Sequence, residues 1–446
     1  MKKLLALPLL VLGLPTAALA APEDAVTQSR LEADVARLVA FGTRHTLSSQ
    51  DDPKRGIGAA RRWAESELRK TSAACGACLE IVLPETVVKD EGRVPVATRL
   101  VDVVAIQRGT VRPNEVVIVQ GHIDSRNSDA MDAKGDAPGA NDDGSGTALV
   151  LEAARVLSSQ KFAGTIVYAV LSGEEQGLYG GKLLADYAKA QGWTVKAVLN
   201  NDIVGNSRGS DGLVDDAHVR VFSEGPRDDA SERARDALRS IGGENDSPSR
   251  NLSRWIAGLA DGGLSGELAV RQVWRADRMG RGGDHLPFQA MGYPAVRFTV
   301  AVENYERQHQ NVRTESGRPF GDTIEAMDFP YLAKVTKLNV KALAALAAAP
   351  MPPVAKVTAA VQTYTDVDWA AVPGAARYRV WQRRTDAAGW EAKPVAETDT
   401  AHVRLEGVRG DDWFFGVSSV AADGAESPIA SALPGGAYLP EAAGGR

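Results

Sequence analysis

The chain contains six histidines, and His122 stands where a chemically active side chain is expected. It follows Gly121 and the β-branched run Glu115 to Gln120, a pattern typical of a buried strand. In open α/β sheets, ligands bind at the carboxyl ends of the strands. Asp124, two residues further on, could accept the second ring N–H of His122 and raise its basicity as a metal ligand.

Acidic residues follow at three more points in the chain, each next to an expected helix or strand. They are Asp142 and Asp143 in the glycine-rich stretch 139–146, Glu174 and Glu175 after the apolar run 164–171, and Asp202 after the run 195–199. Alone, an acidic pair at a helix N-terminus is favoured by the helix dipole. A lone Glu-Glu pair is most simply a solvated turn. The argument for chemistry therefore rests on the whole set.

Two histidines and three carboxylates, with one carboxylate left over, are a ligand set that suits zinc, although several divalent ions accept it. If one carboxylate bridges two ions, each ion receives a nitrogen and oxygens and keeps a position open for water. The remaining carboxylate can take a proton from that water. This combination predicts a two-metal hydrolase.

Five motifs and a late histidine, in this order over about residues 100–315, resemble the di-zinc metallopeptidases of family 28, of the leucyl aminopeptidase and aminopeptidase Y type. They are GHIDS, GANDDGSG, SGEEQGLYGG, NNDIVGN and GGDHLPF. The resemblance implies two Zn²⁺ per chain, peptide or protein substrates, and removal of N-terminal residues. The metal ligands that it implies are His122 and Asp202 for one ion, Glu175 and His309 for the other, and Asp142 between them.

The resemblance also assigns two residues that bind no metal. Glu174 is the general base, and Asp124 is the partner of His122. It further implies a cis peptide bond between Asp142 and Asp143. The metals would stabilise the tetrahedral oxyanion, and Glu174 would return the proton to the leaving amine.

The sequence departs from the family pattern near the last ligand. Gln308 occupies the place of a tyrosine that helps to hold the oxyanion in many relatives, and Tyr305 is nearby. His285 is a rival for the last ligand, but its Asp-His-x-x-Phe block looks like a separate pocket motif, which favours His309. Asp284, His285 and Tyr305 are therefore expected to bind substrate.

Strand-like and helical patterns alternate from about Leu31 to Ala349, as is typical of α/β folds. We expect an open, mostly parallel sheet flanked by helices, of the zinc exopeptidase type, over the catalytic domain 21–349. The proline cluster 350–353 is expected to be a linker. Residues 354–437 contain short strands broken by turns and resemble a fibronectin type III β-sandwich, and 438–446 are expected to form a flexible tail.

Residues 1–20 combine Lys2 and Lys3, an apolar run and Ala18-Leu19-Ala20, as in a secretory signal peptide cleaved after Ala20. We therefore expect export to the periplasm or beyond, and a local disulfide between the two cysteines, Cys75 and Cys78. A net charge of -6 argues against nucleic acid as the main partner. No later stretch predicts stable membrane insertion, and the oligomeric state is left open.

Three other functions are compatible with these residues. A glutaminyl cyclase-like acyltransferase could use the same fold with one zinc. A carboxypeptidase or another amide hydrolase could use the same metals. A non-catalytic exported binding protein would need a broken metal site, and the sequence shows no broken position. Metal stoichiometry and assays on peptides beginning with glutamine or leucine separate the first of these from an aminopeptidase.

Overall fold

The computed structural model describes residues 21–264 and 267–433. The predicted signal peptide and C-terminal tail lie outside these residues. Among the described residues, no helix combines the length and the apolar character needed to cross a membrane.

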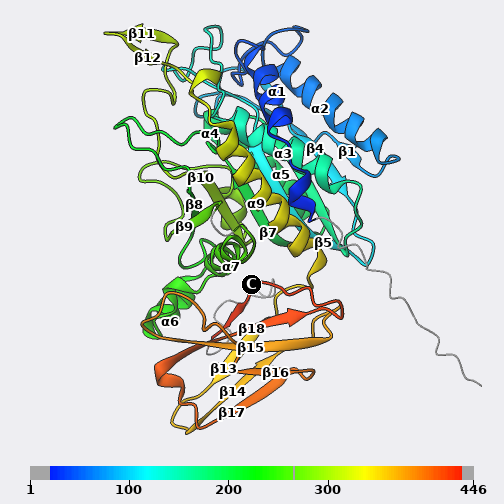
Figure 1. Ribbon diagram of the computed structural model, residues 1–446, viewed down its shortest axis with the longest axis vertical. Coiled ribbons are helices and arrows are strands. Elements are labelled where there is room, and N and C mark those ends of the chain that lie inside the picture. Colours follow the sequence, from blue (N-terminus) through cyan, green and yellow to red (C-terminus); the bar gives the residue numbers. More distant parts are fainter. Residues whose placement is uncertain (1–20, 265–266, 434–446) are drawn as a thin grey trace, which may run out of the picture.

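An eight-stranded mixed sheet forms the centre of the larger part of the molecule (Figure 1). Its four central strands, β6, β5, β7 and β10, are mutually parallel, which confirms the predicted α/β fold class. In spatial order the strands are β1 (Glu80–Val82), β4 (Val103–Gln107), β6 (Gly164–Leu171), β5 (Arg112–His122), β7 (Thr194–Asn201), β10 (Ala295–Val300), β8 (His218–Ser223) and β9 (Ala269–Val273).

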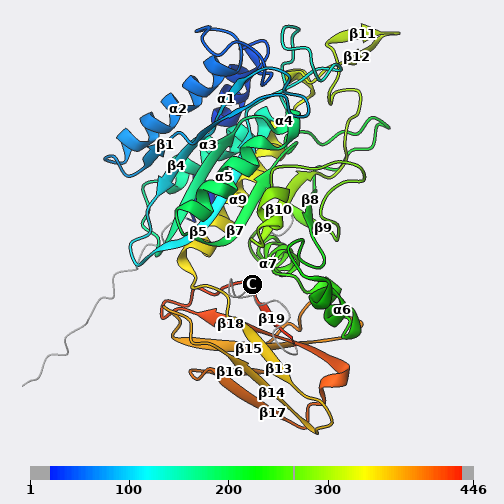
Figure 2. The same cartoon turned by 180° about the vertical axis from the view of Figure 1, so that it is seen from behind.

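Helices cover both faces of this sheet, as Figures 1 and 2 show from opposite sides. Alternate residues of β5 face the two cores: Val117 and Val119 pack on one side, and Val116 and Ile118 on the other. The first face carries α1 (Gln28–Val39), α2 (Ile57–Ala74), α3 (Gly144–Leu157), α7 (Pro248–Gly263) and α9 (Phe329–Ala348). The second carries α5 (Tyr179–Ala190) and α8 (Leu286–Ala290).

The N-terminus of α3 comes very close to the ends of β5 and β7. A Cβ atom added to Gly146 would lie 2.1 Å from the carbonyl oxygen of Asn201, and one added to Gly121 would lie 2.7 Å from the backbone of Gly146. Glycine is therefore required where the helix start packs against the two strand ends. This packing brings the loop before α3 to the carboxyl edge of the sheet.

Shorter elements connect these layers. The single turn α4 (Glu174–Gly177) lies between β6 and α5, and α6 (Glu232–Ser240) precedes α7. Two small hairpins are formed by β2 (Glu85–Val88) with β3 (Thr98–Val101) and by β11 (Arg313–Glu315) with β12 (Arg318–Phe320).

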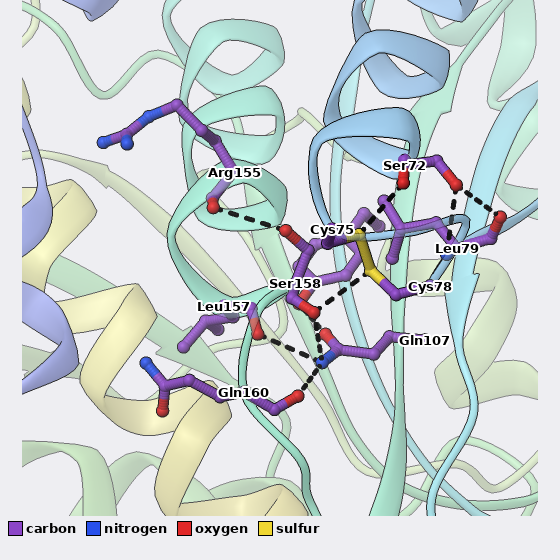
Figure 3. Close-up of a disulfide and its surroundings, with 10 residues drawn as sticks. Ser72, Cys75, Cys78, Leu79, Gln107, Arg155, Leu157, Ser158 and Gln160 are labelled. Carbon is purple, nitrogen blue, oxygen red and sulfur yellow. Dashed lines mark hydrogen bonds between the residues drawn. A yellow bond between two sulfur atoms is a disulfide. The ribbon is translucent and has the colours of Figure 1, made fainter.

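A disulfide joins Cys75 and Cys78 at the end of α2, with 5.6 Å between their Cα atoms (Figure 3). Sγ of Cys78 lies 3.1 Å from the carbonyl oxygen of Ser158, the residue that ends α3. The cross-link therefore closes a turn that packs against the neighbouring helix end, as expected for a structural disulfide.

The C-terminal part consists of two antiparallel sheets packed around Val367, Trp369, Tyr378, Val380 and Phe415. Its identification as a fibronectin type III domain stays a prediction. One sheet contains β13 (Ala355–Thr358), β14 (Tyr364–Trp369) and β17 (His402–Glu406). The other contains β16 (Ala396–Thr398), β15 (Arg377–Arg384), β18 (Trp413–Val420) and β19 (Ala430–Ala432).

This sandwich packs directly on the larger part, at the end of the molecule opposite α4 (Figure 1). Nη2 of Arg383 lies 2.6 Å from both carboxylate oxygens of Asp246, and both side chains are buried. Asn251 in α7 donates a hydrogen bond to Ser431, and Ser419 donates one to the carbonyl of Met351. The proline-rich segment is thus held between two packed bodies.

Candidate metal centre

Neighbouring parallel strands end beside the predicted ligands. His122 is the last residue of β5, Glu174 and Glu175 open α4 just after β6, and Asp202 follows β7 directly. Asp142 lies in the loop before α3, and His309 in the loop after β10. Because parallel strands share one carboxyl edge, these five segments converge there.

The Asp142 carboxylate lies between the two histidines. Its Oδ1 is 3.3 Å from Nε2 of His122, and its Oδ2 is 2.9 Å from Nε2 of His309. On the outer sides, Oε1 of Glu175 is 3.0 Å from Nε2 of His309, and Oδ2 of Asp202 is 3.9 Å from Nε2 of His122. One carboxylate thus presents an oxygen to each of two neighbouring groups of donor atoms.

These donors form two groups whose ligand atoms lie within 4.8 Å of one another: His122 with Glu174 and Asp202, and Asp142 with Glu175 and His309. Glu174, predicted as a base rather than a ligand, therefore lies close to the first group. Its position is compatible with contact to a water molecule there or to an ion.

Some buried atoms of these residues have no hydrogen-bond partner, which indicates whether the site fits a metal ion. Among the described residues, Nε2 of His122 and Oε1 of Glu175 are buried and receive or donate no hydrogen bond. Leaving buried polar atoms unsatisfied is costly, and such atoms at a native site call for a partner. Two imidazole nitrogens and several carboxylate oxygens are the donors that Zn²⁺ accepts. The residues fit a divalent metal centre.

The charges of the groups reflect their crowding. Burial opposes protonation of His122, but Asp124 and Asp142 outweigh it and hold the pKa of the ring well above its ordinary value. Burial likewise opposes protonation of His309, yet Glu175 and Asp142 raise the pKa of its ring to about 10. Burial raises the pKa of Glu174 well above its ordinary value. The carboxylates thus attract positive charge strongly into this pocket.

Asp124 organises the turn that carries the two glutamates. Its carboxylate accepts N–H bonds from Gly173 and Glu175, at 2.9 and 3.1 Å, and a hydroxyl bond from Thr46 at 2.9 Å. Nδ1 of His122 lies 3.0 Å from the main-chain carbonyl oxygen of Asp124 and 3.6 Å from its carboxylate. The nearer acceptor for the ring is therefore the main-chain carbonyl of Asp124 rather than its carboxylate, which the sequence predicted, and the carboxylate positions α4.

Two acids fix the loop that carries Asp142. The peptide bond between Asp142 and Asp143 is cis, and the Asp143 carboxylate accepts the N–H groups of His122 and Gly146. Asp322, which the sequence analysis missed, accepts the N–H groups of Asn141 and Asp142. Burial raises the pKa of Asp322 to about 7. No sequence pattern marked Asp322, because it lies in an irregular loop far along the chain.

Arg297 is a second residue that the sequence analysis missed. It lies within β10, is fully buried, and places Nη2 2.7 Å from Oδ1 of Asp202 and Nη1 3.0 Å from Oδ2 of Asp277. Since Arg297 holds one oxygen of Asp202, the other oxygen faces His122. An arginine inside an otherwise apolar strand, AVRFTV, was the signal available in the sequence.

The three residues predicted to bind substrate lie in different surroundings in the structure. His285 is buried away from the donor groups, where its Nε2 lies 2.8 Å from the carbonyl oxygen of Ala276, and burial lowers its pKa to about 4. Asp284 is buried close to His122, and burial raises its pKa to about 7. The side chain of Tyr305 is largely exposed. Gln308, in contrast, donates to Oδ2 of Asp142 at 3.3 Å.

Arg126 is a third residue absent from the predicted site. Its Nε lies 3.0 Å from Oε2 of Glu175, and its Nη2 lies 2.7 Å from Nδ1 of His309. The loops on either side are joined by hydrogen bonds between Ser128 and Asn311. Proximity to the GHIDS motif was the only signal for Arg126 in the sequence.

Comparison with solved structures places this arrangement among known folds. The chain is similar to LapA aminopeptidase of Legionella pneumophila, with a TM-score of 0.53 at 20% identity over 73% of this chain and 74% of that one. It is also similar to a leucine aminopeptidase precursor from Bacteroides thetaiotaomicron, with a TM-score of 0.50 at 14% identity over 71% and 97% of the two chains. At these identities the similarity shows a shared fold.

Sequence relatives share much more of the chain. A probable zinc metalloprotease of Pyricularia oryzae is 43% identical over 95% of this chain and 86% of its own length. One of Leptosphaeria maculans is 40% identical over 96% and 99% of the two chains. The sequence model of peptidase family M28 matches residues 102–327, the span that holds all the donors described above. The chain therefore belongs to peptidase family M28.

Proposed function

We propose that this protein is a zinc-dependent peptidase that removes N-terminal residues from peptides, with two zinc ions held by His122, Asp142, Glu175, Asp202 and His309. The observation that carries the proposal is the Asp142 carboxylate, whose two oxygens face the Nε2 atoms of two histidines. A carboxylate in this position is suited to bridge two ions. Family membership and the probable zinc metalloproteases among the relatives support zinc as the metal.

Zinc bound at this centre would polarise a peptide carbonyl and make a water molecule more acidic. Glu174 accepts the proton of the attacking water and returns it to the leaving amine. Its half-buried carboxylate is held at the start of α4 by the N–H bonds that Asp124 accepts from the same turn. Burial raises the pKa of Glu174 well above its ordinary value, which makes its carboxylate a stronger proton acceptor.

An exopeptidase acting on free N-termini is favoured by the acids around the site. Glu174 and the buried Asp284 add two carboxyl groups beyond the five proposed ligands, and burial raises the pKa of both; a protonated amine that binds beside them would favour their charged forms. The two solved structures of similar fold described above are both named as aminopeptidases. We also propose that residues 1–20 direct export and that residues 354–437 form an accessory module of the fibronectin type III kind.

The test is a comparison of peptides by mass spectrometry, with zinc measured on the same sample. Leucine-initiated peptides with a free N-terminus are expected to lose residues one at a time, and N-acetylated copies are expected to stay intact, at two zinc ions per chain. Loss of ammonia from glutamine-initiated peptides, with one zinc, would instead identify a cyclase. Release of C-terminal residues from the acetylated copies would identify a carboxypeptidase.

A further inference from the structure

The two histidines of the candidate centre have different neighbours on their second ring nitrogens. Nδ1 of His122 lies 3.0 Å from a carbonyl oxygen, which accepts a hydrogen bond. Nδ1 of His309 lies 2.7 Å from Nη2 of Arg126, and a guanidinium can only donate. Metal-binding histidines almost always donate their second N–H to a carboxylate, a carbonyl or water. His122 meets this rule and His309 does not.

With a metal ion on His309, Arg126 would have no acceptor on this ring. When Nε2 of His309 binds an ion, the ring proton must be on Nδ1, so two donors would face each other at 2.7 Å. The Nε atom of Arg126 is buried and forms an ion pair with Oε2 of Glu175 at 3.0 Å. The Nη atoms of the guanidinium would then carry donors for an additional acceptor, and the side chain retains 15% of its accessible surface at the edge of the site.

Further arginines surround the same donors. Arg93 is exposed and donates to the main-chain carbonyl of Glu175 at 2.9 Å. Arg281 is half-buried and donates to Oε1 of Gln308 at 3.1 Å, and Gln308 in turn donates to Asp142. We call Arg93, Arg126 and Arg281 the arginine rim. Three arginines thus lie within one or two contacts of the proposed ligands.

We propose that Arg126 binds a carboxylate of the substrate next to the scissile bond, with Arg93 and Arg281 adding positive charge around it, so that the enzyme prefers peptides that carry a negative charge there. Guanidinium and carboxylate are matched in shape and charge and form two parallel hydrogen bonds. The proposal rests on the proposed peptidase function. The carboxylate belongs either to the free C-terminus of a short peptide or to an acidic side chain.

The experiment compares four peptides with the zinc-loaded full chain: Leu-Leu, Leu-Leu-amide, Leu-Glu-amide and Glu-Leu-amide. We expect kcat/KM to be about 10- to 100-fold higher for at least one peptide with a carboxylate than for Leu-Leu-amide. This factor corresponds to the strength of a hydrogen bond to a charged group. The preferred peptide identifies the source: a C-terminal carboxylate, or an acidic second or first residue. Equal values for all four peptides would overturn the proposal.

Arg126→Gln is expected to abolish most of this preference. Arg126→Lys should retain part of it, since lysine keeps the positive charge but cannot donate two parallel hydrogen bonds to one carboxylate. Arg108→Gln is the matched control, because Arg108 is an exposed arginine paired with Glu80 beyond the far end of β4. Arg108→Gln should leave the preference unchanged. If Arg126→Gln slows all four peptides by the same factor, Arg126 does not select the carboxylate.

Zinc affinity, measured by competition with a chelator, distinguishes substrate binding from a merely structural function. If Arg126 only held Glu175 in place, Arg126→Gln would weaken zinc binding. We expect equal or tighter binding, because the variant removes a positive charge and a competing donor beside two ligands. If the wild-type protein hydrolyses none of the four peptides, the proposed function fails; if it does and the charge preference is absent, only the present proposal fails.

Discussion

Glu174 and Glu175 are adjacent glutamates at the start of α4 with different surroundings. Glu175 is buried, with Oε1 3.0 Å from His309, whereas Glu174 is half-buried and lies near His122 and Asp202. A base must reach water and keep a free oxygen, whereas a ligand directs its oxygens to the metal. The geometry therefore gives the two residues separate functions that mutation can distinguish.

Glu174→Gln is expected to retain zinc and to lower kcat by about 100- to 10,000-fold, because glutamine has nearly the same shape but cannot take up the proton. Glu175→Gln is the matched variant and should lose zinc. Zinc content by atomic emission and kcat on a leucine-initiated peptide are measured on the same samples. A Glu174→Gln protein that is short of zinc would make Glu174 a ligand, and one with normal turnover would exclude it as the base.

The two candidate histidines near the end of the catalytic region differ in what their rings contact. Nε2 of His309 faces Asp142 and Glu175, whereas Nε2 of His285 lies beside the carbonyl oxygen of Ala276. We expect His309→Ala to lower zinc binding to about one ion per chain, because one group then lacks its nitrogen ligand. His285→Asn should keep both ions, although its stability falls. Loss of zinc from the His285 variant alone would reverse this assignment.

At the scale of elements, Glu224 joins the end of β8 to the first turn of α7. Its carboxylate accepts the N–H of Asp228 at 3.0 Å and contacts the hydroxyl of Ser249 at 3.2 Å. Burial raises the pKa of Glu224 from 4.5 to about 7 in the folded protein. The folded state therefore binds more protons than the unfolded state between these values, and stability falls as the pH rises through this window.

Glu224→Gln should imitate the protonated form of the side chain and so remove the fall in stability with rising pH. The two proteins are expected to have similar Tm values near pH 4.5, and the variant should be the more stable at pH 8, by at most about 3 kcal/mol. Thermal unfolding followed by circular dichroism at both pH values measures the difference, and Glu232→Gln, an exposed substitution in α6, is the control. A Tm difference that does not change with pH would contradict the argument.

At the scale of the whole molecule, the sandwich and the larger part are joined by the Arg383–Asp246 pair. The side chains retain 4% and 0% of their accessible surface. Removing one partner of a buried ion pair leaves an uncompensated charge and costs about 3–5 kcal/mol. The C-terminal sandwich therefore packs on the larger part through a buried ion pair.

Arg383→Met is expected to lower Tm by several degrees but to leave zinc content unchanged, because the pair lies between β15 and the segment before α7, whereas the proposed ligands lie at the carboxyl edge of the sheet. Changing both partners, Arg383→Met with Asp246→Leu, should recover only a small part of the loss, since the buried Arg254 also contacts Asp246, at 3.5 Å, and loses this partner. Arg404→Met, which breaks the exposed pair with Asp366 in the same sandwich, is the control and should cost at most about 1 kcal/mol. An equal effect of Arg383→Met and Arg404→Met would show that the junction contributes little to stability.

Much of the fold and part of the candidate site could be predicted from local patterns. The apolar runs of β5, β6 and β7 and the helix Phe329–Ala348 follow from hydrophobic periodicity. Because parallel strands end at one edge of the sheet, His122, Glu175 and Asp202 could be expected near one another. These inferences require only short stretches of sequence and a general rule of sheet geometry.

The remaining parts of the site were decided by contacts between distant segments. His309 has a left-handed backbone, with φ of 52°, and reaches Asp142 only because the loop after β10 folds back over the sheet edge. Arg297, Asp322 and Arg126 act through partners that are 95, 180 and 183 residues away in the chain. The sequence by itself determined the donor types and the strand ends. Only the tertiary structure decided which charges neutralise, orient or compete with those donors, because such contacts depend on long-range packing that leaves no periodic pattern in the sequence.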